Sequence, residues 1–143
     1  MSDQFIVVST QRALDKFLES VNYLHDALIR EVAVGSRGYV DVAGWMHGDL
    51  APADAHLIFH SQNPGSPCIE MVFEELQKIR LQFGEELDPR GAVTEHGVTL
   101  YLTGGPEREQ FLVSARIMRY RILGRAFVGR EYRAITRIVD TDY

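Results

Sequence analysis

Alternation of apolar and polar side chains between Cys68 and Phe83 is the feature that most restricts how this chain folds. Apolar side chains occupy every second position, all odd-numbered, in two runs: Ile69, Met71 and Phe73, then Ile79, Leu81 and Phe83. A period of two residues is typical of a strand with one buried face. The two runs therefore predict a β-hairpin with its loop at residues 75–77, although that loop contains neither Gly nor Asn.

Directly opposed side chains would support each other in this hairpin. Phe73 would face Ile79, and Glu74 would meet Lys78 on the other face, with each pair contributing about 0.2–1 kcal/mol. The hairpin also predicts much of the core. We expect buried side chains at Ile69, Met71, Phe73, Ile79, Leu81, Phe83, Leu100 and Leu102, packed against Leu14, Phe17 and Leu18.

A different period near the N-terminus predicts one amphipathic helix. Its apolar side chains recur at spacings of three and four residues, at Ala13, Leu14, Phe17, Leu18 and Val21. Ser9 or Thr10 is a suitable N-cap.

Strand-like runs separated by turn residues occupy most of the remaining chain. They cover residues 5–8, 24–34, 39–42, 55–61, 98–103, 109–123 and 131–139. Residues 35–38 are expected to form the turn that sends 39–42 back along 24–34. Residues 55–61 fit a helix or a strand, and we choose a strand because the turn at 63–67 then joins it to the hairpin.

The run at 109–123 changes parity, since Ala115 belongs to one alternating set and Met118 to the other. Such a change predicts a bulge or a bend onto a second sheet. The strand spacing predicts an α+β fold. It consists of one N-terminal amphipathic helix and a bent, mostly antiparallel sheet or sandwich of about six to eight strands, in a single domain spanning 1–143.

Composition indicates a soluble protein of ordinary kind. Apolar residues are 45% and charged residues 24%, and no apolar run approaches the ~18 residues of a membrane span. The N-terminus lacks the basic segment and long apolar run of a signal peptide. One cysteine, Cys68, excludes an internal disulfide and favours a reducing cytoplasm. We interpret it as a small buried thiol.

Charge is divided unevenly along the chain. Residues 1–107 carry 7 Lys and Arg against 16 Asp and Glu, whereas residues 108–143 carry 8 Arg against 4 acids. A cluster of guanidinium groups repels itself unless carboxylates or an anion lie among them. We predict that most of these arginines, including Arg119, Arg121, Arg133 and Arg137, pair with acids such as Glu70, Glu74, Glu85 and Glu86. An exposed surface that binds nucleic acid is the alternative.

Two groups of histidines could carry polar chemistry. His25 and Asp26 combine an imidazole with a carboxylate, but neighbours on a strand point to opposite faces, which favours structural roles. His47, Asp49, His56 and His60 could bind a metal ion. On a strand His56 and His60 would lie about 13 Å apart, at ~3.3 Å per residue, so we predict no metal site and no cofactor.

Two short segments suggest a family. The series Leu24-His25-Asp26-Ala27-x-Ile29, followed by Val72-Phe73-x-x-Leu76-x-x-Ile79-x-Leu81, resembles small uncharacterised bacterial β-rich proteins. Some of these are grouped with predicted immunity proteins of polymorphic toxin systems. The Gly44-Trp45 segment is similar to such families as well. The resemblance implies a non-enzymatic, cytoplasmic, β-rich protein and implies no catalytic residues.

The sequence contains none of the common catalytic motifs, such as Gly-x-Ser-x-Gly or His-Glu-x-x-His. We therefore expect a non-enzymatic cytoplasmic domain that binds a protein partner, either a toxin or a second copy of itself, without a membrane. The alternatives are a metal-dependent enzyme using His47, Asp49 and His60, and nucleic-acid binding through the Arg-rich C-terminal strands. The candidate binding residues are His25, Asp26, Trp45, His47, Asp49, Arg119, Arg121, Arg133 and Arg137.

Overall fold

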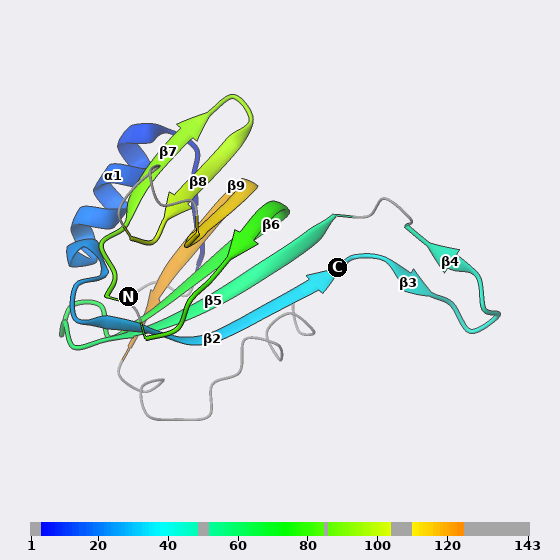
Figure 1. The fold of residues 1–143 in the computed structure, drawn as a ribbon, viewed down its shortest axis with the longest axis horizontal. Helices are drawn as coiled ribbons and strands as arrows, with labels where there is room; N and C mark the ends of the chain where they lie inside the picture. The colour runs from blue at the N-terminus through cyan, green and yellow to red at the C-terminus, as the bar shows by residue number, and fades with distance from the viewer. Residues whose placement is uncertain (1–3, 49–51, 85, 104–109, 125–143) are drawn as a thin grey trace.

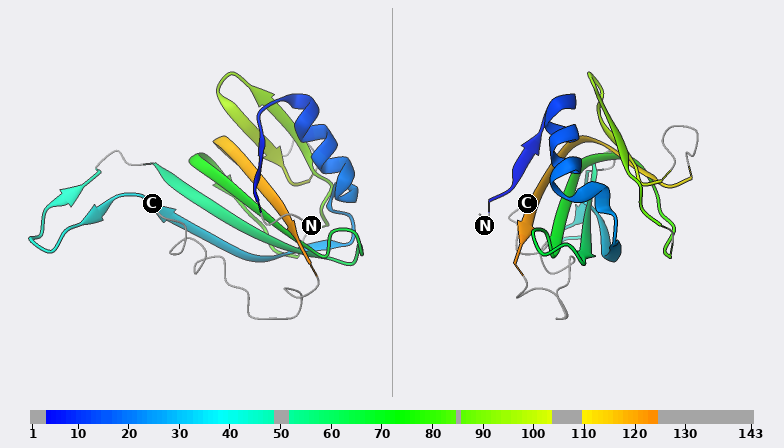
Figure 2. Two further views of the ribbon diagram at one scale, coloured as in Figure 1. Left: turned by 180° about the vertical axis from the view of Figure 1, so that it is seen from behind. Right: turned by 90° about the vertical axis from the view of Figure 1, so that its left-hand side faces the viewer.

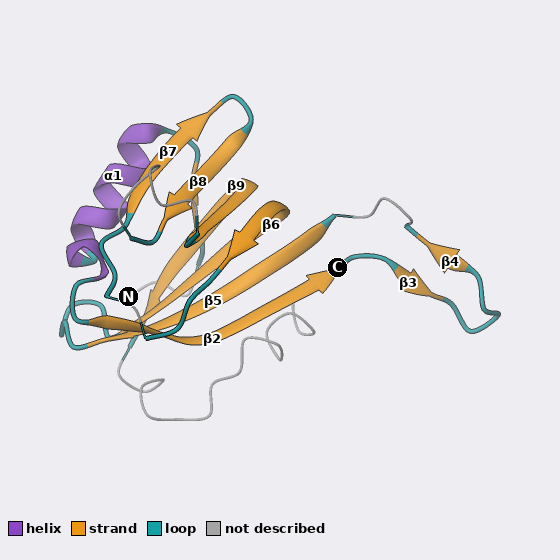
Figure 3. Cartoon of the chain, in the orientation of Figure 1, coloured by secondary structure: helices purple, strands orange, loops and turns teal. Residues whose placement is uncertain are grey.

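A strongly bent antiparallel sheet and one helix make up the main part of the molecule (Figure 1). The computed structural model describes residues 4–48, 52–84, 86–103 and 110–124. Seven strands form the main sheet in the order β2-β5-β6-β9-β8-β7, and β1 also pairs with β9. Two further strands, β3 and β4, form a small sheet of their own. The predicted α+β class is confirmed (Figure 3).

The elements have the following bounds: β1 Ile6–Val8, α1 Gln11–Ser20, the 3-10 helix η1 Asn22–Leu24, β2 Ala27–Ser36, β3 Tyr39–Val40, β4 Met46–His47, β5 Ala53–Ser61, β6 Cys68–Arg80, β7 Arg90–Thr94, β8 Gly97–Tyr101 and β9 Leu112–Leu123. Every strand pair among them is antiparallel. Within these described residues, no helix has the length and apolarity needed to cross a membrane.

The predicted hairpin at residues 68–83 is wrong, because these residues form one strand. β6 pairs with β9 along its whole length, from Cys68 opposite Leu123 to Arg80 opposite Leu112. Two irregularities explain the misleading alternation. Glu75 has a positive φ of 54°, and the register shifts between Leu76 and Lys78.

Because of these irregularities, the set of alternate residues of β6 that faces the core changes along the strand. Ile69, Met71 and Phe73 face it before the bend, and Leu76 and Ile79 face it afterwards. The core-facing positions switch from odd to even residue numbers at Leu76 and back to odd numbers at Ile79. The apolar residues on both sides of the bend are therefore odd-numbered, as they would be in two straight strands joined by a loop. The chain bends at Glu75 but keeps β9 as its partner instead of folding back on itself.

The predicted change of parity in β9 is confirmed. Val113 and Ala115 face the core in its first part, and Met118 and Tyr120 face it in the second. Residues 74–76 of β6 lie opposite residues 115–117 of β9, so the two strands bend together. The strand predicted at 131–139, and its pairing with 109–123, lie outside the described residues.

Helix α1 packs against β7 (Figure 2), and its buried face contributes Leu14, Phe17 and Leu18 to the core. The Thr10 hydroxyl accepts a hydrogen bond from the Ala13 amide at 3.1 Å, which confirms Thr10 as the N-cap. Leu14 approaches β7 so closely that a Cβ at Gly91 would overlap its side chain. The contact explains why a glycine, rather than a larger residue, follows Arg90 in this strand.

Most of the predicted core is correct. Leu14, Phe17 and Leu18 are buried, as are Ile69, Met71, Phe73, Leu100 and Leu102. Ile79 and Leu81 are partly buried and pack against the core. The prediction that Phe83 is buried is wrong, since its side chain is 67% exposed. Phe83 is exposed because β6 ends at Arg80 and Phe83 follows in a loop.

The strand predicted at 24–34 forms as β2, and that at 55–61 forms as β5. The expected return at 39–42 is wrong: β2 pairs with β5, whereas Tyr39–Val40 pairs with Met46–His47. The chain does not reverse at residues 35–38. It reverses at 41–45, where Asp41 N–H bonds to the Trp45 carbonyl, and so β3 and β4 project beyond the main sheet (Figures 1 and 2).

Candidate functional site

The projecting segment from Arg37 to Gly48, which we call the hairpin arm, concentrates exposed apolar side chains. Trp45 is 72% exposed. The other large apolar side chains exposed on the arm are Tyr39, Val40, Val42 and Met46. Large aromatic side chains are normally buried or used in contacts with partners. The arm is therefore the strongest candidate for a binding surface in the described part of the chain.

Asp41 organises the tip of the arm. Its Oδ1 accepts hydrogen bonds from the backbone N–H groups of Ala43 and Trp45, both at 2.9 Å. Its Oδ2 lies 2.8 Å from His47 Nε2. A carboxylate that collects several donors in this way fixes a turn without any apolar core.

These contacts lower the pKa of Asp41. The hydrogen bond with His47 is the largest cause, and the backbone N–H of Trp45 is the next. The imidazole of His47 also stacks on the Tyr39 ring, with ring centroids 4.7 Å apart. Polar bonds on one side and ring stacking on the other therefore fix the arm locally while Trp45 stays exposed.

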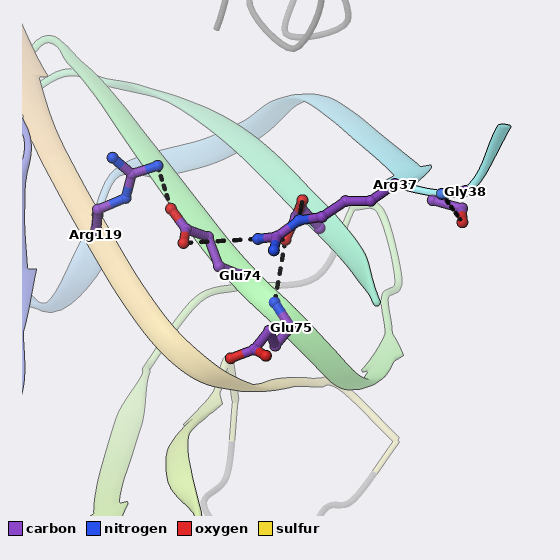
Figure 4. A network of polar contacts seen from close by, with 7 residues as sticks. Arg37, Gly38, Glu74, Glu75 and Arg119 are labelled. Carbon is purple, nitrogen blue, oxygen red and sulfur yellow. Dashed lines mark hydrogen bonds and ion pairs between the residues drawn. The ribbon is translucent and has the colours of Figure 1, made fainter. Parts of the chain in front are cut away.

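An ion-pair network fixes the base of the arm to the main sheet (Figure 4). The Arg37 guanidinium donates two hydrogen bonds to Asp54 of β5, at 2.8 and 2.9 Å. Asp54 also accepts a hydrogen bond at 3.1 Å from the backbone N–H of Glu75. Glu75 lies at the bend of the neighbouring strand, β6. The pKa of Arg37 is raised, chiefly by the Asp54 hydrogen bond.

Glu74 extends this network to β9. Its carboxylate lies 3.7 Å from Arg37 Nη2 and pairs on its other side with Arg119. Arg37, Glu74 and Arg119 therefore connect the arm to β6 and β9 (Figure 4), on the sheet face away from the core side chains Phe73 and Met118.

Arg121 lies further along that face and is buried with Glu70. Its Nε donates a hydrogen bond to Glu70 Oε1 at 2.8 Å, and the Phe5 ring lies against both Arg119 and Arg121. The predicted pairing with Glu70 and Glu74 is thus found for these two arginines. Arg133 and Arg137 lie outside the described residues, as does Glu85.

His25 and Asp26 lie at the junction of η1 and β2, both exposed. His25 Nε2 is 3.5 Å from Asp88 rather than against Asp26. Asp26 has a positive φ of 59°, and its backbone carbonyl accepts the Gln62 N–H at 3.0 Å. The structure therefore does not bring the two side chains together as an acid–base pair.

The histidines considered for a metal are spread over the molecule. His47 lies in the arm, whereas His60 lies at the far end of β5 opposite Cys68. His56 is on the same strand, four residues from His60, and its pKa is lowered mainly by burial. Among the residues described, no group of three His, Cys, Asp or Glu side chains is placed to hold a metal ion. Asp49 lies outside them.

Cys68 is buried, which confirms the prediction of a small buried thiol. Burial raises the pKa of its thiol to about 11. At neutral pH the group is therefore a protonated thiol and a poor nucleophile.

A second exposed apolar region lies at the N-terminal end of β2. Leu28 and Ile29 line a cavity of about 480 Å³ with Phe83, Gly84 and Leu87, among others. Leu28 and Phe83 are both more than half exposed. We call this region the β2 groove.

Trp45 and His47 were selected from the sequence. The other exposed apolar residues of the hairpin arm, and Leu28 and Phe83 of the β2 groove, were not. A usable signal was present in the arm, because residues 39–46 contain several large apolar side chains between turn residues, with no core period. Phe83 carried no such signal, since its parity agreed with that of a buried strand.

Comparison of the chain with protein-family models, with curated proteins and with solved structures finds no match.

Proposed function

We propose that this protein acts by binding another protein, and that the hairpin arm is the surface that makes the contact. The observation that carries the proposal is the exposure of Trp45 and its apolar neighbours on a hairpin that is held in place by polar bonds. The sequence suggests a toxin or a second copy of the chain as the partner. A lone, buried cysteine supports a reducing cytoplasmic setting.

The arm has the physical properties of an efficient contact surface. Trp and Tyr are enriched among the residues that dominate binding energies. Asp41 and Arg37 fix the arm before a partner arrives, so less conformational entropy is lost on association. A surface of this kind favours protein recognition over catalysis.

The arginines give less support to nucleic-acid binding. Arg119 and Arg121 each pair with a glutamate, and Arg121 is only 7% exposed. Phosphate binding depends on cations that are available to the backbone. The ion pairs of these two arginines therefore favour a structural role for them in the sheet over a role in binding phosphate.

Photocrosslinking in the native host tests the proposal. Val42 is replaced by p-benzoyl-phenylalanine, which keeps Trp45 in place, and Arg12 on the exposed side of α1 is replaced in a matched control. We expect one dominant protein adduct from position 42, identified by peptide sequencing, and its loss when Trp45→Ser is added. Equal, diffuse labelling from both positions would refute the proposal.

A further inference from the structure

The β2 groove has fixed, mostly apolar walls. Leu28 and Ile29 of β2 form one wall, and the loop that follows β6 forms the other, with Gln82, Phe83, Gly84, Glu86 and Leu87. The loop is held in place, because Leu87 is 3% exposed and the next residue, Asp88, donates its backbone N–H to the Leu102 carbonyl at 3.0 Å. The cavity of about 480 Å³ lies within the ~300–1,000 Å³ that is typical of ligand sites. The groove is therefore formed before a ligand arrives, which lowers the entropy cost of binding.

Strained backbone lies beside this groove, at the entry to β2. Four residues other than glycine have φ between 52° and 59°, in the left-handed region: Asn22, Tyr23, Leu24 and Asp26. Side chains of L-residues disfavour this region, and residues held in it are concentrated at binding and active sites. The turn brings His25 Nε2 to 3.5 Å from Asp88, which directly follows the loop wall. The strain is therefore located where the two segments that line the groove come together.

The two segments that line the groove are acidic. Glu86 is the one charged residue among the described side chains of the walls. The loop between β6 and β7, residues 81–89, contains three acids and no Lys or Arg, and residues 24–29 contain one acid and no Lys or Arg. The nearest arginines in the sequence, Arg30, Arg80 and Arg90, lie outside these segments, on β2, β6 and β7. A cation is therefore the charge that complements this groove.

Going beyond the arm contact proposed above, we infer that the β2 groove is a second binding site, and that it binds a segment of another protein in which apolar side chains lie next to Arg or Lys. The apolar side chains of the segment cover Leu28 and Phe83, and its cation pairs with Glu86. The groove and the arm lie at opposite ends of β2 (Figure 1). Leu28 and Ser36 are separated by roughly 26 Å at ~3.3 Å per residue, so one short segment does not reach both sites.

The exposure of the walls favours a chain segment over a small molecule. Leu28 is 56% exposed and Phe83 is 67% exposed. Sites for small molecules enclose about 70–90% of the ligand surface. A half-open groove covers only one face of its ligand, and a chain segment that projects from a folded protein needs no more than that. Arg suits the cationic position, because its planar guanidinium forms two parallel hydrogen bonds with a carboxylate.

NMR titration of the ¹⁵N-labelled full chain with the blocked peptide Leu-Arg-Phe-Arg-Leu tests the inference. We expect the amide resonances of Leu28, Ile29, Phe83 and Leu87 to shift and to saturate below about 1 mM peptide, while those of the arm stay in place. The peptides Leu-Glu-Phe-Glu-Leu and Ser-Arg-Ser-Arg-Ser should each bind at least about tenfold more weakly, because one lacks the cations and the other lacks the apolar side chains.

Two substitutions in the groove separate its apolar and charged contributions. Leu28→Ser should weaken binding of the Arg peptide about tenfold, because it removes apolar surface that the peptide covers. Glu86→Gln should weaken binding about threefold, as expected for an exposed ion pair. Ile6→Ser is the control for the first, since Ile6 on β1 is 52% exposed, and Glu19→Gln on α1 is the control for the second. Both controls, and Trp45→Ser in the arm, should bind like the parent chain.

Several results would overturn the inference. They are an absence of shifts in the groove, equal binding of the Ser-Arg peptide, and unchanged binding in Leu28→Ser and Glu86→Gln. Shifts of the same size with n-hexylamine would assign the groove to a small apolar amine instead. Shifts that grow with protein concentration in the absence of peptide would assign it to a second copy of the chain. If the groove failed these tests while position 42 still gave one specific protein adduct, the function proposed for the arm would stand.

Discussion

The main sheet with helix α1 and the hairpin arm use the same kinds of residue in opposite ways. In the sheet, Phe73 is fully buried between strands and helix, whereas in the arm Trp45 is 72% exposed. The sheet is held by a contiguous apolar core. The arm is held by the hydrogen bonds of Asp41 and by the Arg37–Asp54 ion pair.

This difference shows how a small protein can present apolar side chains without burying them. Hydrophobic burial stabilises only what it covers, so a hairpin that must stay uncovered needs another source of order. Polar bonds to a single carboxylate supply that order here. The arm's apolar residues are consequently available to a partner.

The largest loss of stability is expected from truncating a buried aromatic ring of the main sheet. Phe73→Ala should lower the free energy of unfolding by about 3–5 kcal/mol, because it removes transfer energy and leaves a cavity in the core. Phe83→Ala makes the same chemical change at an exposed position and should cost less than about 1 kcal/mol. Urea denaturation of both variants measures the contrast, and equal losses would mean that the core is misassigned.

A smaller effect is expected where the two regions join. Asp54→Asn removes the charge that receives two hydrogen bonds from Arg37, and hydrogen bonds to charged groups contribute about 1.5–3 kcal/mol. We expect a loss of that order, together with a faster-moving arm seen in the fluorescence anisotropy of Trp45. Glu19→Gln on the exposed face of α1 is the control. Unchanged anisotropy in Asp54→Asn would show that the arm does not depend on this pair.

Removing the exposed indole should hardly change stability. Trp45→Ser is expected to alter the free energy of unfolding by no more than about 0.5 kcal/mol, as for other surface substitutions. Thermal melting followed by circular dichroism measures it. A loss above 2 kcal/mol would place Trp45 in the folding core and remove the distinction between arm and sheet.

The smallest effect concerns pH and the arm alone. The pKa of Asp41 is lowered below its ordinary value of 3.8 by His47 and by backbone N–H groups. A lowered pKa in the folded arm means that this stabilisation is fully present above pH 3.8 and is lost as the pH falls through the lower, folded value. Trp45 is the sole tryptophan, so its fluorescence should report a transition below pH 3.8.

Asp41→Asn is the matched variant for this titration. It keeps the side-chain shape but cannot ionise, so its fluorescence should lack the Asp41 step. A step of the same midpoint in this variant would assign the transition to another group.

Local patterns were sufficient for some elements and not for others. The spacing of Leu14, Phe17 and Leu18 predicted both α1 and its buried face, since a helix of this kind is defined by residues close in sequence. The change of parity after Ala115 likewise predicted the bend of β9. The alternation on either side of Glu75 wrongly predicted a hairpin. A pattern of apolar residues does not reveal the positive φ of Glu75 or the register shift that follows it.

The candidate site was predicted only in part for the same reason. Trp45, His47 and Arg119 were selected from the sequence, yet the bond from Arg37 to Asp54 joins residues whose relation depends on how β2 pairs with β5. The β2 groove combines Leu28 with Phe83, which are far apart along the chain.

The class of fold, the helix, most strand positions and most of the core could be predicted from the amino-acid sequence. Periodicity is enough for these, because which side of a strand or helix is apolar depends on near neighbours. The pairing of the strands, the places where the chain reverses and the exposure of particular apolar side chains depend on contacts between residues far apart in the sequence. Pairing depends on which strand edge is available in the assembled sheet, and exposure depends on what packs above each residue. For that reason Phe73 and Phe83, which share one parity in one alternating run, lie inside the core and on the surface respectively.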